Sequence, residues 1–205
     1  IIFLLTSLAS SAQTWNETLY KKIEESIQQP NIRINHEVDI RDYGASPEAS
    51  AAHNQKAIQK AIDRCAKKGG GKVIIPSGLK FRTGAIELKS GVNLHIEENA
   101  ILEFAFQPDL YPIVETSWEG LDCYNLSPCI YALRADDIAI TGKGTIDGGG
   151  TRETWWPWCG ATKYGWKEGM ISQKIEARPR LLRNGEDGVP MTDEKGKPET
   201  LRTFT

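Results

Sequence analysis

Short apolar runs separated by turn residues dominate the chain between residues 72 and 147. The first five runs, each three to five residues long, lie at 73–75, 79–82, 85–88, 92–96 and 100–104, and the pattern resumes at 130–132 and 138–147. Strands this short are unstable as isolated pairs, but parallel stacking in successive coils buries a continuous core. No Asn-Gly or Asp-Gly hairpin signal separates the first five runs. The pattern favours a right-handed parallel β-helix, with a β-sandwich as the alternative.

Two segments have helical periodicity instead. Residues 52–68 carry one apolar stripe followed by Gly69, the stripe consisting of Ala57, Ile58, Ala61, Ile62 and Cys65. A shorter amphipathic pattern occupies 15–29 and ends at Pro30. Because one amphipathic helix precedes the strands, we expect it to cover the open end of the β stack, where exposed edges would invite aggregation. The predicted fold is therefore all-β, a parallel β-helix with an N-terminal capping helix, incomplete at its C-terminal end.

Two longer segments interrupt the short runs. Residues 107–127 look irregular, and residues 151–200 form a polar, turn-rich insertion that includes a candidate short helix at 168–184. The chain stops at 201–205 in what resembles the start of another strand. We expect three regions: a partial signal peptide at 1–12, a helical segment at 13–37, and the N-terminal part of a β-helix domain at 38–205.

The first eight residues are apolar and precede the small residues Ala9 to Ala12. Ser10 and Ala12 stand at the −3 and −1 positions of a small-x-small cleavage site, and the run is too short to span a bilayer. This predicts an exported protein, periplasmic or secreted; a buried N-terminal strand is the alternative. Export would place the four cysteines in an oxidising compartment. Their pairing stays open, although Cys123 and Cys129 are near enough to close a small loop and Cys65 is expected as a buried thiol.

Charge and composition exclude several partners. A net charge of −2 gives no electrostatic reason for nucleic-acid binding. No cysteine or histidine spacing indicates zinc, so no metal or other cofactor is expected. We expect a monomer.

Several glycine-punctuated motifs follow one another in a distinctive order: 42–45, 69–78, 83–88 and 140–148. Together with the helix at 57–65, this order resembles the N-terminal part of glycoside hydrolase family 28, the polygalacturonase-type pectinases, from about residue 38 to 158. The resemblance implies a right-handed parallel β-helix that hydrolyses α-linked galacturonic acid in pectic polysaccharide with inversion. Inverting glycosidases use two carboxyl groups about 6.5–9.5 Å apart, one as general acid and one as general base. No cofactor is implied.

The family's catalytic motifs are Asn-x-Asp, Asp-Asp, Gly-His-Gly and Arg-x-Lys. The first, third and fourth are absent from this sequence. Asp136-Asp137 mimics the second, but Ala135 replaces the glycine that the family places before it, and the following motif identifies an earlier coil. These aspartates and Asp147 are interpreted as turn residues. No catalytic residue is therefore assigned in this chain, and the chain by itself is expected to be inactive.

Trp155 and Trp156 are the candidate substrate-binding residues. Exposed aromatic rings in loops can stack on sugars, while the same tryptophans, with Trp158, can instead pack the insertion onto the β-helix. A cationic run beyond them either forms a wall of an acidic-sugar cleft or is an ordinary solvated face; it comprises Lys163, Lys167, Lys174, Arg178, Arg180 and Arg183.

Two rival functions remain. A calcium-dependent polysaccharide lyase would need an acidic oxygen-ligand cluster. A non-catalytic carbohydrate-binding β-helix would keep the tryptophans and never supply the acids. Exo or endo cleavage, and homogalacturonan or rhamnogalacturonan as substrate, stay undecided.

Overall fold

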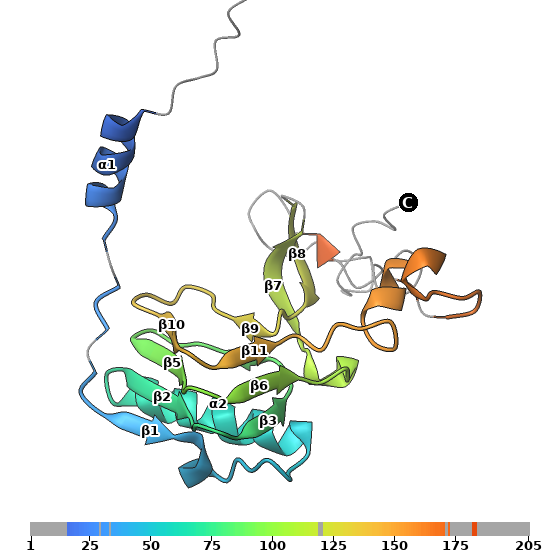
Figure 1. Cartoon of the computed structure of the whole chain (residues 1–205), viewed down its shortest axis with the longest axis horizontal. Helices are drawn as coiled ribbons and strands as arrows, with labels where there is room; N and C mark the ends of the chain where they lie inside the picture. The colour runs from blue at the N-terminus through green and yellow to red at the C-terminus, as the bar shows by residue number, and fades with distance from the viewer. Residues whose placement is uncertain are drawn as a thin grey trace, which may run out of the picture. The chain divides into compact units, whose positions relative to one another are not determined.

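The structure is a computed structural model that describes residues 16–28, 30–32, 34–118, 121–170, 172 and 182–183 (Figure 1). It divides into two units, residues 1–30 and 31–205, each described here by itself. The expected signal peptide and most of the candidate helix at 168–184 lie outside the described residues.

The first unit contains helix α1, Glu17–Ser26. Asn16 caps its N-terminus, because the Asn16 side-chain oxygen accepts the N–H of Leu19 at 3.0 Å. The helix is shorter than the periodicity at 15–29 predicts, and none of its residues is buried. Its apolar stripe, including Leu19 and Ile23, is exposed.

The second unit is built from parallel strands in three sheets. The first sheet has the order β1-β2-β5-β10, the second β11-β6-β3 and the third β4-β9. Their bounds are β1 Glu37–Asp39, β2 Gly71–Ile75, β3 Lys80–Thr83, β4 Ile86–Glu87, β5 Val92–Ile96, β6 Ile101–Phe104, β9 Ile130–Tyr131, β10 Ala139–Gly142 and β11 Thr145–Asp147.

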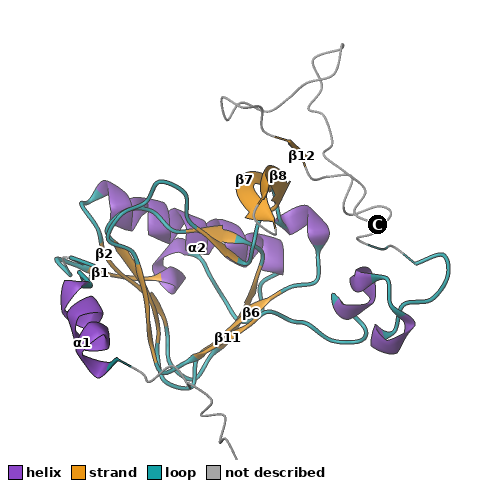
Figure 2. Cartoon of the chain, turned by 90° about the horizontal axis from the view of Figure 1, so that it is seen from above, coloured by secondary structure: helices purple, strands orange, loops and turns teal. Residues whose placement is uncertain are grey.

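Successive strands belong to the first, second and third sheet in turn, and this order repeats in the next coil. Strands β2, β3 and β4 form one coil, β5, β6 and β9 the next, and β10 and β11 begin a third. Every pairing within these sheets is parallel. Figure 2 shows the strands of successive coils overlying one another. This topology confirms the predicted parallel stack of short strands and excludes an antiparallel sandwich.

Aligned apolar columns run through the coils. Val73 pairs in register with Leu94, and Leu94 with Ile140. Val73 and Leu94 are fully buried, whereas Ile140 is 48% exposed. The second sheet repeats this pattern, since Leu102 is fully buried and its register partner Ile146 is 40% exposed. The apolar face of the third coil is thus open to solvent in the described structure.

Helix α2, Ala51–Lys67, packs against the first coils and matches the helix predicted at 52–68. The Ser50 side chain caps it by accepting the N–H of His53. Its buried stripe contains Cys65, a free thiol as expected, and the core also contains Phe81 from β3. Burial raises the pKa of Cys65, which keeps this thiol protonated. The buried Asn54 donates to the carbonyls of Ser46 and Arg82 and so ties α2 to β3.

The segment 107–127, predicted to be irregular, instead contains an antiparallel hairpin of β7, Ile113–Trp118, and β8, Leu121–Leu126. Trp118 pairs with Leu121, so only Glu119 and Gly120 connect the strands. The segment between the paired strands contains neither Asn-Gly nor Asp-Gly, the dipeptides that most strongly indicate a two-residue hairpin. Strand β12, Leu182–Arg183, pairs antiparallel with β8.

Four short 3-10 helices complete the described chain: η1 Ile40–Tyr43, η2 Pro108–Leu110, η3 Trp156–Cys159 and η4 Thr162–Tyr164. Cys129 and Cys159 are free thiols. Within the described residues, no helix combines the length and the apolar character that crossing a membrane requires.

Candidate functional site

Two excursions leave the stack at equivalent points of successive coils. The first follows β6 and carries η2 and the β7–β8 hairpin; the second follows β11 and carries η3 and η4. Since β6 and β11 are paired in register, the excursions start one layer apart. Figure 1 shows the hairpin in yellow-green and the second excursion in orange. We call residues 151–170 the tryptophan loop.

An aromatic cluster joins the two excursions. Trp155 makes edge-on contacts with Phe106 and Tyr111, at ring-centroid distances of 4.7 and 5.3 Å. Trp158 contacts Trp155 at 5.2 Å and Phe106 at 5.8 Å. Such pairs contribute about 0.5–1.5 kcal/mol each beyond the area they bury. The cluster therefore fixes the tryptophan loop to the preceding coil.

Tyr111 anchors this cluster through its hydroxyl group, which donates to the carbonyl of Ala105 at 2.8 Å. Burial raises the pKa of Tyr111 far above its ordinary value, with a further contribution from the neighbouring Cys129. Burial likewise raises the pKa of Cys129. Both groups are neutral at physiological pH and serve packing.

Local hydrogen bonds shape the start of the tryptophan loop. The Thr154 hydroxyl donates to the carbonyl of Gly149 at 2.6 Å and accepts the N–H of Thr151 at 2.7 Å. Helices η3 and η4 each end at a glycine in the left-handed region, Gly160 at φ 72° and Gly165 at φ 96°. The loop thus has a defined conformation before any ligand binds.

The loop forms an open hollow of about 460 Å³, which is lined by Trp155, Trp156, Trp158, Cys159 and Tyr164. Trp156 is 48% exposed and Tyr164 is 43% exposed, so both offer ring surface to a ligand. Trp155 lines the same hollow, but its ring is engaged by the aromatic cluster. The structure thus brings the two predicted tryptophans together.

Sequence reasoning missed Tyr164, and it named Lys163 only as part of a cationic run. The Lys163 Nζ lies over the Tyr164 ring, 4.6 Å from its centroid. The hollow thereby gains an adjacent positive charge. Lys167 is the other member of that run with a described side chain, and it is exposed; the four members from Lys174 to Arg183 have no described side chains.

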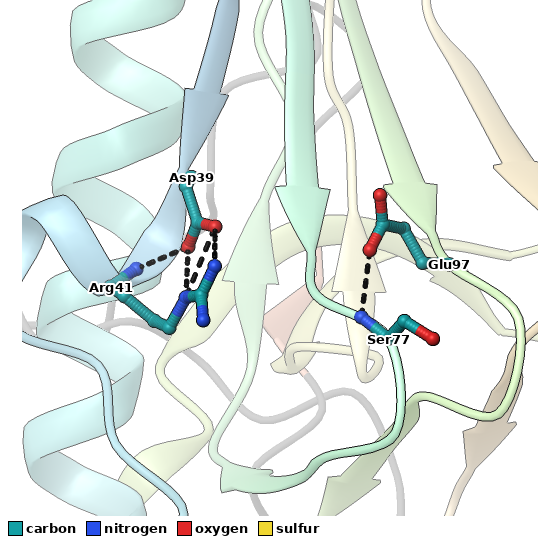
Figure 3. Close-up of polar contacts among 4 residues, drawn as sticks. All are labelled: Asp39, Arg41, Ser77 and Glu97. Atoms are coloured by element: carbon teal, nitrogen blue, oxygen red, sulfur yellow. Dashed lines mark hydrogen bonds and ion pairs between the residues drawn. The ribbon is translucent and has the colours of Figure 1, made fainter.

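A second polar region lies where the strands of the first sheet end (Figure 3). The Asp39 carboxylate, at the end of β1, accepts bonds from the Arg41 backbone N–H and guanidinium. Partial burial raises the pKa of Asp39, but the Arg41 hydrogen bonds and charge outweigh it and hold the pKa below its ordinary value. Glu97, after β5, accepts the N–H of Ser77 at 2.7 Å. The Asp39 carboxylate is thus held within its own segment by Arg41, and the Glu97 carboxylate is held by the preceding coil through Ser77.

An open hollow of about 650 Å³ adjoins Glu97, and His95 lines it. The Thr141 hydroxyl donates to the Asn93 side-chain oxygen at 2.9 Å and contacts His95 Nδ1 at 2.8 Å. Because that hydroxyl proton is committed to Asn93, His95 Nδ1 acts as the donor. This ladder links β5 to β10. No group of three metal-ligating side chains occurs among the described residues.

Asp136 and Asp137 lie in the connection between β9 and β10, whereas Asp147 is the last residue of β11 and bonds to the glycines that follow it. Asp147 accepts the N–H of Gly149 at 2.9 Å. Asp137 has a left-handed backbone with φ 52°, and its carboxylate accepts the N–H of Asn31 at 2.8 Å. The Asp136 carbonyl accepts the N–H of Gly91, which ties this turn to the previous coil.

Comparison with known proteins finds similar polygalacturonases. The chain is 34% identical over 125 residues to an exo-poly-α-D-galacturonosidase of Dickeya chrysanthemi, and 29% identical over 121 residues to an endo-polygalacturonase of Pectobacterium carotovorum. The crystal structure of a hyperthermoactive exopolygalacturonase from Thermotoga maritima matches 89% of the chain with a TM-score of 0.69 and 32% identity. The resemblance to family 28 polygalacturonases is confirmed.

The matched regions define how far this resemblance extends. They cover 57% and 53% of this chain but only 20% and 29% of the two curated polygalacturonases. The chain likewise covers 40% of the Thermotoga exopolygalacturonase. No family model matches the chain.

Proposed function

We propose that this chain is the N-terminal part of an exported, monomeric enzyme that hydrolyses α-linked galacturonan in pectic polysaccharide. The observation that carries the proposal is the likeness to polygalacturonases in both sequence and structure. The short apolar N-terminal run supports export. In this proposal the stack is a right-handed parallel β-helix, and α2 is its cap.

Further coils are expected on the open face of the third one. Ile140 and Ile146 continue buried columns but are 48% and 40% exposed. Burying an apolar side chain of this size contributes about 1.5–3 kcal/mol, so a following coil would gain free energy by covering both. Such coils would supply the side chains that the described coils lack.

The proposed mechanism is a single displacement. One carboxyl group protonates the glycosidic oxygen while a second activates water on the opposite face of the sugar. The carboxylates of Asp39, Glu97 and Asp147 are held by hydrogen bonds to neighbouring residues of the stack. We therefore assign both catalytic groups to further coils and none to this chain.

The tryptophan loop is the proposed substrate contact of this chain. Trp156 is the stacking residue, because this residue is 48% exposed and lines the hollow. Trp155 is its support, because its edge-on contacts with Phe106 and Tyr111 hold the loop in place. Stacking on a sugar face worth about 1 kcal/mol corresponds to roughly fivefold in affinity.

The full-length protein tests the proposed reaction on polygalacturonate. Reducing ends should appear, and NMR of the first product should show inverted anomeric configuration. Ultraviolet-absorbing unsaturated products would instead identify a lyase. Binding without cleavage would identify a carbohydrate-binding β-helix.

A variant then tests the role of Trp156. Trp156→Ala should raise KM about fivefold with little change in kcat, since a stacking contact binds substrate and transition state alike. Trp156→Phe, which retains a ring, is the matched control. Loss of thermal stability in Trp156→Ala without a KM effect would show that Trp156 packs the loop.

A further inference from the structure

The tryptophan loop places one cation beside its aromatic hollow. The Lys163 Nζ is 4.6 Å from the centroid of the Tyr164 ring, and Tyr164 lines the hollow together with Trp156. Lys163 forms no ion pair with any residue that the structure describes. Its ammonium group therefore lies next to a residue of the hollow and has no carboxylate partner among the described residues.

No carboxylate of the tryptophan loop forms an ion pair with Lys163. The loop carries three cations and two anions, Arg152, Lys163 and Lys167 against Glu153 and Glu168. All five side chains are exposed, and none of the five forms an ion pair within the described residues. Among these cations, Lys163 is the one that lies over a ring lining the hollow.

The geometry around Tyr164 is set by the short helix η4. Lys163 and Tyr164 are the last two residues of η4, which ends at the left-handed Gly165. The backbone N–H groups of Tyr164 and Gly165 donate to the carbonyls of Ala161 and Thr162. Ring and ammonium are thus presented together by one hydrogen-bonded turn.

We propose that Trp156, Tyr164 and Lys163 form a subsite for one uronic acid ring, with Lys163 selecting the sugar carboxylate. The two aromatic residues provide flat apolar surface to the ring's C–H face, which neutral and acidic sugars share. The Lys163 ammonium distinguishes them, because a charge-assisted hydrogen bond forms only with the carboxylate. This inference takes its ligand class from the proposed function, but binding is measured separately from cleavage.

The test compares D-galacturonate with D-galactose, which differ in that C6 is a carboxylate in the first and a hydroxymethyl group in the second. Neither monosaccharide has a glycosidic bond, so neither is consumed. Binding to the full-length protein is followed by tryptophan fluorescence and by saturation-transfer NMR. Lys163→Gln should weaken galacturonate binding about tenfold and leave galactose binding unchanged. The galacturonate effect should shrink as salt is raised from about 0.05 to about 0.5 M, because the screening length falls about threefold over that range.

Lys167→Gln is the matched control, because it removes the same charge from the same loop at a residue that does not lie over Tyr164. It should change galacturonate affinity by less than about twofold. Tyr164→Ala should weaken binding of both sugars, whereas Tyr164→Phe should retain both, since the ring is kept.

The outcomes separate this inference from the proposed function. Equal effects of Lys163→Gln and Lys167→Gln, or equal wild-type affinity for both sugars, would overturn the subsite. Hydrolysis of polygalacturonate together with that result would leave the proposed function standing. Lys163-dependent galacturonate binding in a protein that cleaves no galacturonan would support the subsite and refute the hydrolase.

Discussion

Stability measurements on variants of Leu94 and Ile140 can test whether a further coil covers the open face of the third coil. The two residues are register partners in β5 and β10, and both belong to the column that starts at Val73. Leu94 is fully buried, whereas Ile140 is 48% exposed. Replacing each by alanine removes a similar volume of apolar side chain from two environments that differ mainly in what covers them.

The magnitudes follow from these exposures. Leu94→Ala should cost about 3 kcal/mol of unfolding free energy, within the 2–5 kcal/mol usual for buried leucines. Ile140→Ala removes three carbons that are about half buried, and at about 0.8 kcal/mol per buried CH₂ this costs about 1 kcal/mol. At about 2–4 °C per kcal/mol, Leu94→Ala should lower Tm by about 6–12 °C.

Urea unfolding followed by tryptophan fluorescence measures both variants, first in the 205-residue chain and then in the full-length protein. In the 205-residue chain the costs should differ by about 2 kcal/mol. In the full-length protein the cost of Ile140→Ala should rise to that of Leu94→Ala, because another coil covers it. If the cost of Ile140→Ala stayed near 1 kcal/mol in the full-length protein, the reasoning about further coils would be refuted.

Three other predictions concern the same unit. Gly142→Ala should lower the free energy of unfolding in urea by more than about 2 kcal/mol, because Gly142 has φ 104° and an added Cβ would collide with the Ile96 carbonyl. Gly148→Ala, where an added Cβ meets open space, should change it by no more than about 0.5 kcal/mol, and equal costs for the two variants would argue against this packing. Folding lowers the pKa of Asp39, so the stability that its carboxylate contributes to the folded protein is complete above the unfolded value of about 3.9 and is lost as pH falls through the folded pKa. The difference in Tm between wild type and Asp39→Asn should therefore vanish in that acid range. A constant difference at all pH values would contradict the Arg41 pairing. Tyr111→Phe should lower the free energy of unfolding by about 1 kcal/mol, because it removes the hydrogen bond to the Ala105 carbonyl. It should also shift the fluorescence of the adjacent Trp155. An unchanged spectrum would show that the aromatic cluster does not depend on this hydrogen bond.

The elements predicted well are those whose side chains carry a clear period. The stripe from Ala57 to Cys65 identifies α2 to within one residue at each end. The short apolar runs match β2 to β6 because inward-facing positions of a stacked coil must be apolar, as Phe81 and Leu102 show. Local chemistry also predicts that the Asp147 carboxylate accepts a nearby backbone N–H.

The features that were missed depend on contacts distant in sequence or on weak turn signals. The β7–β8 hairpin was not predicted because neither Asn-Gly nor Asp-Gly occurs between its strands. The exposed Ile140 could not be foreseen, because a periodic pattern does not reveal which coil lies above it.

The candidate site was predicted in the same uneven way. Trp155 and Trp156 stand out because large aromatic residues in a loop are conspicuous in any sequence. The difference between them, with Trp155 packed into the aromatic cluster and Trp156 exposed, depends on Phe106 and Tyr111, which lie more than forty residues away in the sequence. The placement of Lys163 over Tyr164 follows from the 3-10 turn of η4, which no hydrophobic period specifies.

The most direct test of the central claim is release of reducing sugar from polygalacturonate, measured side by side for the 205-residue chain and for the full-length protein. The account predicts hydrolysis by the full-length protein and none by the 205-residue chain, because the catalytic carboxylates belong to further coils. Hydrolysis by the 205-residue chain alone, or an inactive full-length protein, would contradict it.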